Sequence, residues 1–149
     1  MSTDEKARRL TDHLQTVLEA VAGADHKNPA VSEQLCAQEI RVLNTVGRDP
    51  CCIMSNIAGA IRLSLSSVTG LIDRLVEKKL VRRDRSNEDR RIVQVELTKE
   101  GRELHETSMQ GRVELARGLL KSLSAEEQDA LVSLFGKISD RIKAEKKQG

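Results

Sequence analysis

Apolar side chains recur at helical spacing in two stretches near the beginning of the chain. In residues 3–22 they fall every three or four positions, which predicts one amphipathic helix, and the glycine- and proline-containing segment 23–29 is expected to end it. Ser32 is a typical N-cap residue, and the apolar pattern that follows it stops at Gly47. These two residues therefore mark the ends of a predicted second helix.

A strand-compatible stretch and two closely spaced helices are predicted next. Residues 51–54 suit a short β-strand, residues 56–61 a short helix and residues 65–79 a longer helix, with residues 62–64 as a tight connection. The longer helix should bury an apolar face formed by Val68, Leu71, Ile72 and Leu75. This arrangement predicts a helix-turn-helix motif, in which Gly59 should let the two helices approach closely.

A β-hairpin is predicted directly after this motif. Residues 80–85 and 92–97 have the pattern of strands, and in the second one apolar and polar side chains alternate. The residues between them, 86–91, are polar and turn-prone, so the hairpin has a charged tip. A hairpin in this position is the wing of a winged helix-turn-helix unit.

Two more helices are predicted after the hairpin. Thr98 is placed to cap a long helix that continues to about Ser122, and Ser124 with Glu127 forms the capping-box pattern that opens a last helix. An apolar stripe follows the last helix at Leu131, Leu134, Phe135, Ile138 and Ile142. The stripes of the first and last helices exceed what a winged unit alone can cover, which favours an obligate dimer.

Size and composition agree with a helical protein. The chain of 149 residues has the length of one domain, 38% of its residues are hydrophobic, and Phe135 is its one aromatic residue, so the core must be aliphatic. No apolar run reaches the length of a membrane span, and the N-terminal residues are polar. We therefore expect no membrane span, no signal peptide and a cytoplasmic location.

The basic residues are concentrated in the middle of the chain. The whole chain carries a formal charge of +2, but residues 48–91 contain ten Lys and Arg residues against six Asp and Glu residues. A localised positive patch is what a DNA-contacting unit needs, because neutralisation of phosphates supplies most of the non-specific affinity for DNA.

Residues 63–104 closely resemble the MarR family of bacterial transcription regulators. The matching pieces are SSVTGLIDRL in the longer helix, EKKLVRR at the entry to the hairpin, Asp89 and Arg91 at its tip, and LTKEG where helix restarts; IRVL at residues 40–43 fits as well. The resemblance implies an intertwined homodimer whose first, fifth and sixth helices form the interface. It also implies that the longer helix of each motif enters a major groove of duplex DNA and that each wing reaches a minor groove.

Pattern and resemblance together predict a mainly α fold with a small β-hairpin. Its architecture should be a winged helix-turn-helix flanked by N- and C-terminal dimerisation helices. The DNA-binding part should span residues 32–101 and the dimerisation helices residues 1–31 and 102–149, within a single domain, 1–149. The predicted function is sequence-specific transcriptional regulation, as a repressor on a pseudo-palindromic operator. A small-molecule effector between the dimerisation helices and the winged part is expected to release the repressor.

The predicted DNA contacts come from two segments. The longer helix of the motif, the recognition helix, should contribute Ser64, Ser66, Ser67, Thr69, Gly70 and Arg74, and the wing should contribute Arg83, Arg85, Asp89, Arg90 and Arg91. Arginines at the hairpin tip can enter the minor groove, whose potential is negative. The expected role of Asp89 is to orient Arg91.

The charges that flank the wing have other expected roles. Arg82 alternates with the wing arginines along its strand, so it should face the other way and pair with Glu77 or Asp84. Lys78 and Lys79 are interpreted as solubilising charges.

The remaining chemistry-bearing residues point to neither an enzyme nor a metal site. His13, His26 and His105 lie far apart, without the spacing of metal ligands. The sequence also contains no nucleophile–base pattern and no phosphate-binding glycine loop. We therefore expect no metal, no cofactor and no enzymatic activity.

Two alternatives stay open. Cys36, Cys51 and Cys52 are either small buried hydrophobic side chains or the thiol sensor of an oxidation-sensing regulator. Cys51 and Cys52 lie in an apolar segment, where burial slows oxidation, whereas Cys36 lies near the start of a helix and is the better sensor candidate. The second alternative is a winged-helix protein-interaction module, against which the basic wing argues.

Overall fold

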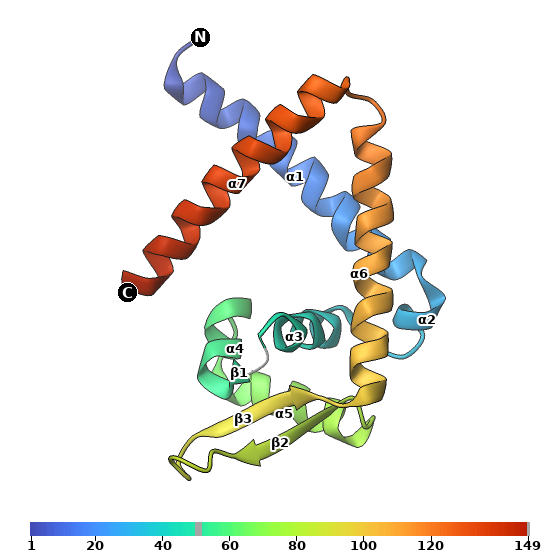
Figure 1. The fold of residues 1–149 in the computed structure, drawn as a ribbon, viewed down its shortest axis with the longest axis vertical. Helices are drawn as coiled ribbons and strands as arrows, with labels where there is room; N and C mark the ends of the chain where they lie inside the picture. Colours follow the sequence, from blue (N-terminus) through green and yellow to red (C-terminus); the bar gives the residue numbers. More distant parts are fainter. Residues whose placement is uncertain (50–51, 149) are drawn as a thin grey trace. The chain divides into compact units, whose positions relative to one another are not determined.

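The computed structural model describes residues 1–49 and 52–148, with the side chain of His26 left aside. By its internal contacts the chain forms two compact units, Met1–Arg112 and Val113–Gly149. Figure 1 labels the elements, which in chain order are α1 (Thr3–Lys27), α2 (Pro29–Ser32), α3 (Ala37–Arg48), β1 (Cys52–Ile53), α4 (Met54–Ile61), α5 (Leu65–Glu77), β2 (Val81–Arg85), β3 (Val93–Leu97), α6 (Lys99–Leu120) and α7 (Ala125–Gln148). Within the described ranges, no helix is both long enough and apolar enough to cross a membrane.

Three short strands form an antiparallel sheet in the first unit. β3 lies between β1 and β2, and its residue Val95 is paired with Cys52 on one side and Arg83 on the other. β2 and β3 make the predicted hairpin, whose tip extends beyond the helices of this unit (Figure 1). β1 falls in the stretch predicted to be strand-compatible, of which Cys51 lies outside the described residues.

The hydrophobic core of the first unit packs α3, α4 and α5 against the sheet. The whole predicted apolar face of α5 is buried, at Val68, Leu71, Ile72 and Leu75. These residues share one buried cluster with Leu43 of α3, Ile57 of α4 and Val95 of β3, none of which is exposed to solvent. The predicted mainly α fold with a winged helix-turn-helix is confirmed.

The turn between α4 and α5 is built differently from the expectation. Gly59 does not let the helices approach, because it lies on the exposed side of α4 and an added Cβ would meet no atom within 4 Å. α4 instead ends at Arg62, which has a left-handed backbone (φ 56°) and donates its N–H to the carbonyl of Ala58. An arginine in this conformation carries a steric cost that a glycine would not.

The N-terminal helices also differ from the prediction. α1 continues through Gly23 to Lys27, because one glycine costs a helix only about 1 kcal/mol. Asn28 then caps α2, its side chain accepting from the N–H of Ala30 at 3.2 Å. Ser32 is therefore not an N-cap but the last residue of α2, and the following helix begins only at residue 37.

The start of α6 is fixed tightly against the entry to β2. Thr98 caps the helix as predicted, with its Oγ1 accepting from the N–H of Gly101 (3.0 Å) and donating to the carbonyl of Lys79 (2.7 Å). A Cβ at Gly101 would lie 1.9 Å from the carbonyl oxygen of Leu80. Only glycine fits there, which explains the glycine of the LTKEG segment.

The second unit opens α7 with the predicted capping box. Ser124 Oγ accepts from the N–H of Glu127 (3.2 Å), and Glu127 Oε2 accepts from the N–H of Ser124 (2.8 Å). Gln128 donates to two carbonyls of the preceding turn, those of Leu120 and Leu123. None of the described residues of α7 is buried, so its apolar stripe is open to solvent.

Candidate nucleic-acid interface

Hydrogen-bonded hydroxyl groups, centred on Ser64, cap the N-terminus of α5. Ser64 Oγ accepts from the N–H of Ser67 (3.2 Å) and donates to Ser67 Oγ (2.8 Å). Ser66 Oγ lies 3.1 Å from the same Ser64 oxygen. One turn further on, Thr69 Oγ1 donates to the carbonyl of Leu65 (2.8 Å). The hydroxyls predicted to contact bases are thus already engaged with α5 itself.

The face of α5 opposite the core is open, as the sequence predicts. Five of the six predicted contact residues are exposed and the sixth, Thr69, is half-buried; the five are Ser64, Ser66, Ser67, Gly70 and Arg74. A Cβ at Gly70 would meet no atom within 4 Å. Short side chains along this face allow another molecule to approach the helix backbone closely.

At the hairpin tip Asp89 holds Arg91 in place. Asp89 Oδ1 accepts from the backbone N–H (3.0 Å) and Nε (3.1 Å) of Arg91, and its Oδ2 accepts from Nη2 (3.2 Å). These side-chain and backbone hydrogen bonds lower the pKa of Asp89. The side chain of Arg91 is nevertheless 91% exposed. The expected pairing is therefore present, and it orients an exposed guanidinium group.

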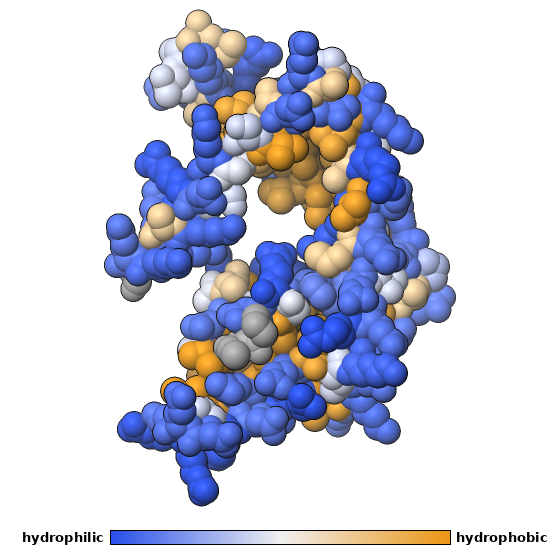
Figure 2. All heavy atoms as spheres, in the orientation of Figure 1, coloured by the Kyte–Doolittle hydropathy of each residue, from blue (hydrophilic) through white to orange (hydrophobic). Residues whose placement is uncertain are grey.

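The remaining contacts make the tip a defined turn. The hydroxyl of Ser86 is shielded from solvent and accepts from the N–H groups of Glu88 (3.2 Å) and Asp89 (3.4 Å). Arg85 Nη1 donates to the carbonyl of Arg90 (2.9 Å). Figure 2 shows hydrophilic atoms over the outer end of the hairpin. The wing is thus a charged tip on an ordered hairpin.

The arginines of β2 have different partners on its two faces. Arg83 pairs with Asp73 of α5 at 2.5 Å, which ties the wing to the recognition helix. Arg82 faces the other way, as expected, but its main partner is Glu96, with hydrogen bonds of 2.8 and 3.2 Å. The prediction of Glu77 or Asp84 is corrected, because Glu96 lies directly opposite Arg82 in the β2–β3 register and Asp84 is 3.9 Å away.

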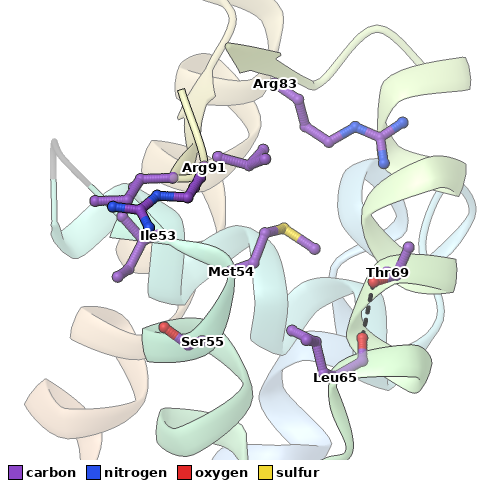
Figure 3. Close-up of a pocket in the computed structure, with 9 residues that line it drawn as sticks. Ile53, Met54, Ser55, Leu65, Thr69, Arg83 and Arg91 are labelled. Atoms are coloured by element: carbon purple, nitrogen blue, oxygen red, sulfur yellow. Dashed lines mark hydrogen bonds between the residues drawn. The ribbon is translucent and has the colours of Figure 1, made fainter. Parts of the chain in front are cut away.

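A hollow of about 420 Å³ lies between the start of α5 and the wing (Figure 3). This wing hollow is lined mostly by apolar side chains, with arginines at its edge: Ile53, Met54, Ser55, Leu65, Thr69, Arg83, Arg91, Ile92 and Val93. It brings together predicted contact residues of the recognition helix and of the wing. The motif and the hairpin therefore contribute to one continuous surface.

Comparison with known proteins agrees with this geometry. Residues 35–93 match the family model of the MarR family. The HTH-type transcriptional regulator PecS of Dickeya dadantii is 33% identical over 112 residues, which are 73% of this chain and 68% of PecS. The chain belongs to the MarR family.

Solved structures of MarR-type regulators share the fold. FabT of Streptococcus pneumoniae, solved in complex with DNA, has a TM-score of 0.76 at 21% identity, covering 93% of this chain and 98% of FabT. BpsR of Bordetella bronchiseptica has a TM-score of 0.67 at 25% identity, covering 88% of this chain and 98% of BpsR. The DNA binding of BpsR is regulated by 6-hydroxynicotinic acid. The chain is a winged helix-turn-helix regulator of transcription.

In this MarR-family chain, Lys78 has a structural role that the sequence did not reveal. Its Nζ donates to Glu39 Oε2 (2.6 Å) and to the carbonyl of Gln34 (2.7 Å), which joins the end of α5 to α3. Burial alone raises the pKa of Glu39, but hydrogen bonds from Lys78 and Cys36, with the positive charge of Lys78, lower it below its ordinary value. The interpretation of Lys78 as a solubilising charge is wrong, because Glu39 is buried and needs a counter-charge.

A buried chain of hydrogen bonds joins α6, α3 and α1. His105 Nδ1 lies 2.8 Å from Asn44 Oδ1, and Asn44 Nδ2 donates to Ser108 Oγ (3.1 Å). Ser108 Oγ donates to Asp25 Oδ1 (3.3 Å), and Arg112 Nη2 donates to Asp25 Oδ2 (2.9 Å). Asn44 and Ser108 are almost fully buried. Asn44 interrupts an apolar helix face, which is the sequence signal that could have revealed this polar chain.

The end of this polar chain opens into a second hollow, of about 270 Å³. This α1 hollow is lined by residues of α1, α3 and α6: Leu18, Val21, Ala22, Asp25, Ala37, Ile40, Arg41 and Arg112. Arg112 Nε is buried and has no hydrogen-bond partner among the described residues. The α1 hollow therefore combines an apolar wall with the paired side chains of Asp25 and Arg112.

The described cysteines occupy contrasting places. Cys36 is exposed at the N-cap of α3, whereas Cys52 is buried in β1, and burial together with the charge of Asp49 raises the pKa of Cys52 to about 11. Cys51 lies outside the described residues. Among the described side chains, no group of three or more His, Cys, Asp or Glu residues is arranged to hold a metal ion.

Proposed function

We propose that the chain is a sequence-specific repressor that binds a pseudo-palindromic operator as a homodimer and is released by a small-molecule effector. The observation that carries this function is the wing hollow, because it joins the exposed start of α5 to Arg83 and Arg91 in one surface. The recognition helix enters the major groove through Ser64, Ser66, Ser67, Thr69, Gly70 and Arg74. The wing follows the neighbouring backbone and minor groove through Arg83, Arg85, Asp89, Arg90 and Arg91.

Wing and recognition helix have different tasks in this proposal. Arg91, exposed and oriented by Asp89, neutralises phosphate or enters the minor groove, which adds affinity for any duplex. Short side chains at the start of α5 reach base edges, which selects a half-site. A bound dimer blocks access of the transcription machinery to the promoter, and the cytoplasm is the location that we propose for it.

Salt-dependent binding tests the wing. Arg91→Ala should weaken binding to all duplexes and reduce the slope of log K against log salt by about one unit. Arg82→Ala is the matched control, since it removes the same charge from an arginine that also has an acidic partner, Glu96, but does not line the wing hollow. Equal effects of the two substitutions would show that the wing is not a DNA contact. No duplex binding by the unaltered protein would favour the protein-interaction module instead.

The uncovered apolar faces support the homodimer. In the first unit α1 exposes Leu10, Leu14, Val17 and Leu18, and in the second unit α7 exposes Leu131, Leu134, Phe135, Ile138 and Ile142. A soluble protein rarely leaves such stripes in water, so a second copy of the chain is the partner that we assign to them. The dimerisation helices then fall in residues 1–31 and 102–149, and the DNA-binding part in residues 32–101.

Paired substitutions in α7 test the dimer. Ile138→Arg should give monomers in sedimentation equilibrium and a loss of operator affinity, because it places a charge in the stripe. Asp140→Arg is the control, since residue 140 lies about half a helical turn away from residue 138. A dimer that survives Ile138→Arg unchanged would contradict this part of the proposal.

The α1 hollow is the proposed effector site. Its apolar wall suits a small organic molecule, and the positive charge of Arg112, one of the lining residues, suits an anionic or hydrogen-bond-accepting group on that molecule. An occupant that draws Arg112 away from Asp25 disturbs the series of buried hydrogen bonds that leads to Asn44 in α3. Because α5 packs against α3, this disturbance can reach the recognition helix. A coupling of about 1–3 kcal/mol is enough to weaken operator binding by about 5- to 150-fold.

A thermal-shift screen of small molecules tests the effector site. A true effector should raise the melting temperature of the unaltered protein, weaken operator binding, and do neither in Arg112→Gln. Arg117→Gln is the matched control, because Arg117 lies on the same helix outside the residues that line the α1 hollow. A ligand that acts equally on both variants binds elsewhere.

A further inference from the structure

Leu65, the first residue of α5, is a large apolar side chain that is 54% exposed. A single exposed leucine needs no explanation on an ordinary surface. This one occupies the helix end that meets DNA in the proposed function, one helical turn before Thr69. Among residues 64–70 it is the one large apolar side chain that is exposed.

The hydroxyl groups around Leu65 have few protons left to donate to a base. Ser64 Oγ gives its proton to Ser67 Oγ, so it must accept in its contact with Ser66, whose proton is then used as well. Thr69 gives its proton to the carbonyl of Leu65. Of these four hydroxyl groups, that of Ser67 alone keeps a proton for an outside acceptor. Base selection by hydroxyl donors is correspondingly weak.

Leu65 and Met54 border the wing hollow (Figure 3), and Ile92 is another of its lining residues. Ile92 is itself 38% exposed, so the surface beside Leu65 is apolar, and Arg83 and Arg91 stand at its edge. The major groove offers one apolar group, the 5-methyl of thymine, and is flanked by phosphates. An apolar centre with cations at its edge is complementary to that arrangement.

We propose that Leu65 recognises the 5-methyl group of a thymine in each operator half-site. Preference for thymine at that position then comes from an apolar contact and not from a hydrogen bond. This inference rests on the proposed function, since it requires the start of α5 to lie in the major groove. Burial of one methyl group corresponds to about a fourfold change in Kd.

Deoxyuridine substitution isolates this contact, because deoxyuridine differs from thymidine only by the missing methyl. The probe is a duplex enriched by the dimeric protein from a pool of random sequences. Each thymine is replaced in turn, and Kd is measured by fluorescence anisotropy at fixed salt. One thymine per half-site should show about a fourfold increase in Kd, and the others should show little change.

Variants assign the effect to Leu65. In Leu65→Ala the ratio of Kd for the uracil and thymine duplexes should fall to about one, whereas Leu65→Met, which keeps an apolar side chain, should retain most of it. Ser66→Ala is the matched control on the same turn and should keep the ratio even if its overall affinity changes. Leu65→Ala is expected to fold, because Leu65 is exposed and alanine is a strong helix former.

Three results would overturn the inference, and they are distinguishable. If sequence-specific binding is intact but no thymine is methyl-dependent, the contact is absent while the proposed function stands. If the methyl dependence persists in Leu65→Ala, another side chain reads the thymine. If the unaltered protein selects no duplex at all, the proposed function fails and the inference with it.

Discussion

Removal of the Asn44 side chain should expose how strongly the polar chain holds the first unit together. Asn44 is 1% exposed and lies between two partners, accepting from His105 and donating to Ser108. Its amide nitrogen needs Ser108 Oγ as acceptor, so the amide oxygen faces His105 and Nδ1 of His105 must be the donor. Asn44→Ala therefore leaves the N–H of the half-buried His105 ring without an acceptor.

The cost of Asn44→Ala follows from these contacts. An unmatched buried donor costs about 1–3 kcal/mol, and the cavity left by the amide adds to it. We expect the free energy of unfolding to fall by about 2–4 kcal/mol. Ser108→Ala should cost less on its own, and the double substitution should cost less than the sum, with a coupling of about 0.5–3 kcal/mol.

Urea denaturation followed by circular dichroism measures these quantities, at one fixed protein concentration because unfolding of a dimer depends on concentration. Asn56→Ala is the matched control, since Asn56 is exposed on α4 and its loss should change stability by no more than about 0.5 kcal/mol. A loss below about 1 kcal/mol for Asn44→Ala, or strict additivity with Ser108→Ala, would refute this account of the polar chain.

Three further predictions concern the same unit. Arg62→Gly should raise the free energy of unfolding by about 1 kcal/mol in urea denaturation, because it relieves a left-handed backbone; a decrease would contradict this. Burial, and to a smaller extent the charge of Arg48, lowers the pKa of His105. The stabilising contribution of neutral His105 should therefore be fully present above the ordinary histidine pKa of 6.5 and be lost as the pH falls below it. In melting curves recorded at several pH values, His105→Gln should flatten this dependence. Because burial raises the pKa of Cys52 to about 11, iodoacetamide at neutral pH should label exposed Cys36 and spare Cys52 in mass spectra; equal labelling of the two would contradict the burial of Cys52.

The sequence predicts best where one local pattern determines the outcome. The buried face of α5 follows from helical periodicity, and the caps at Thr98 and Ser124 follow from side chains that reach their own backbone. The pairing of Asp89 with Arg91 is equally local, since the two residues are two positions apart in a turn. None of these features depends on a distant part of the chain.

The failed predictions depend on contacts between distant residues or on competing local signals. Lys78 looks like a surface charge because Glu39, which it neutralises, lies 39 positions earlier. Ser32 has the residue type of an N-cap, but Asn28 caps a short helix first and Ser32 becomes its last residue. Leu65 is not among the predicted DNA contacts because its neighbours are hydroxyl residues. Only the hydrogen bonds among these residues show how few protons they can donate to a base.

The position of α3 shows how the two hollows can communicate. On one face its residue Leu43 belongs to the cluster that holds α4 and α5, and on another face Asn44 belongs to the polar chain that ends at Asp25 and Arg112. A close-packed core transmits strain, so we expect a displacement of α3 to move α5 as well. The wing is tied to α5 in turn through Arg83. We therefore expect an occupant of the α1 hollow to shift the recognition helix and the wing together. This shift changes the spacing of the two recognition helices in the dimer and leaves the contacts of each helix with its own half-site intact.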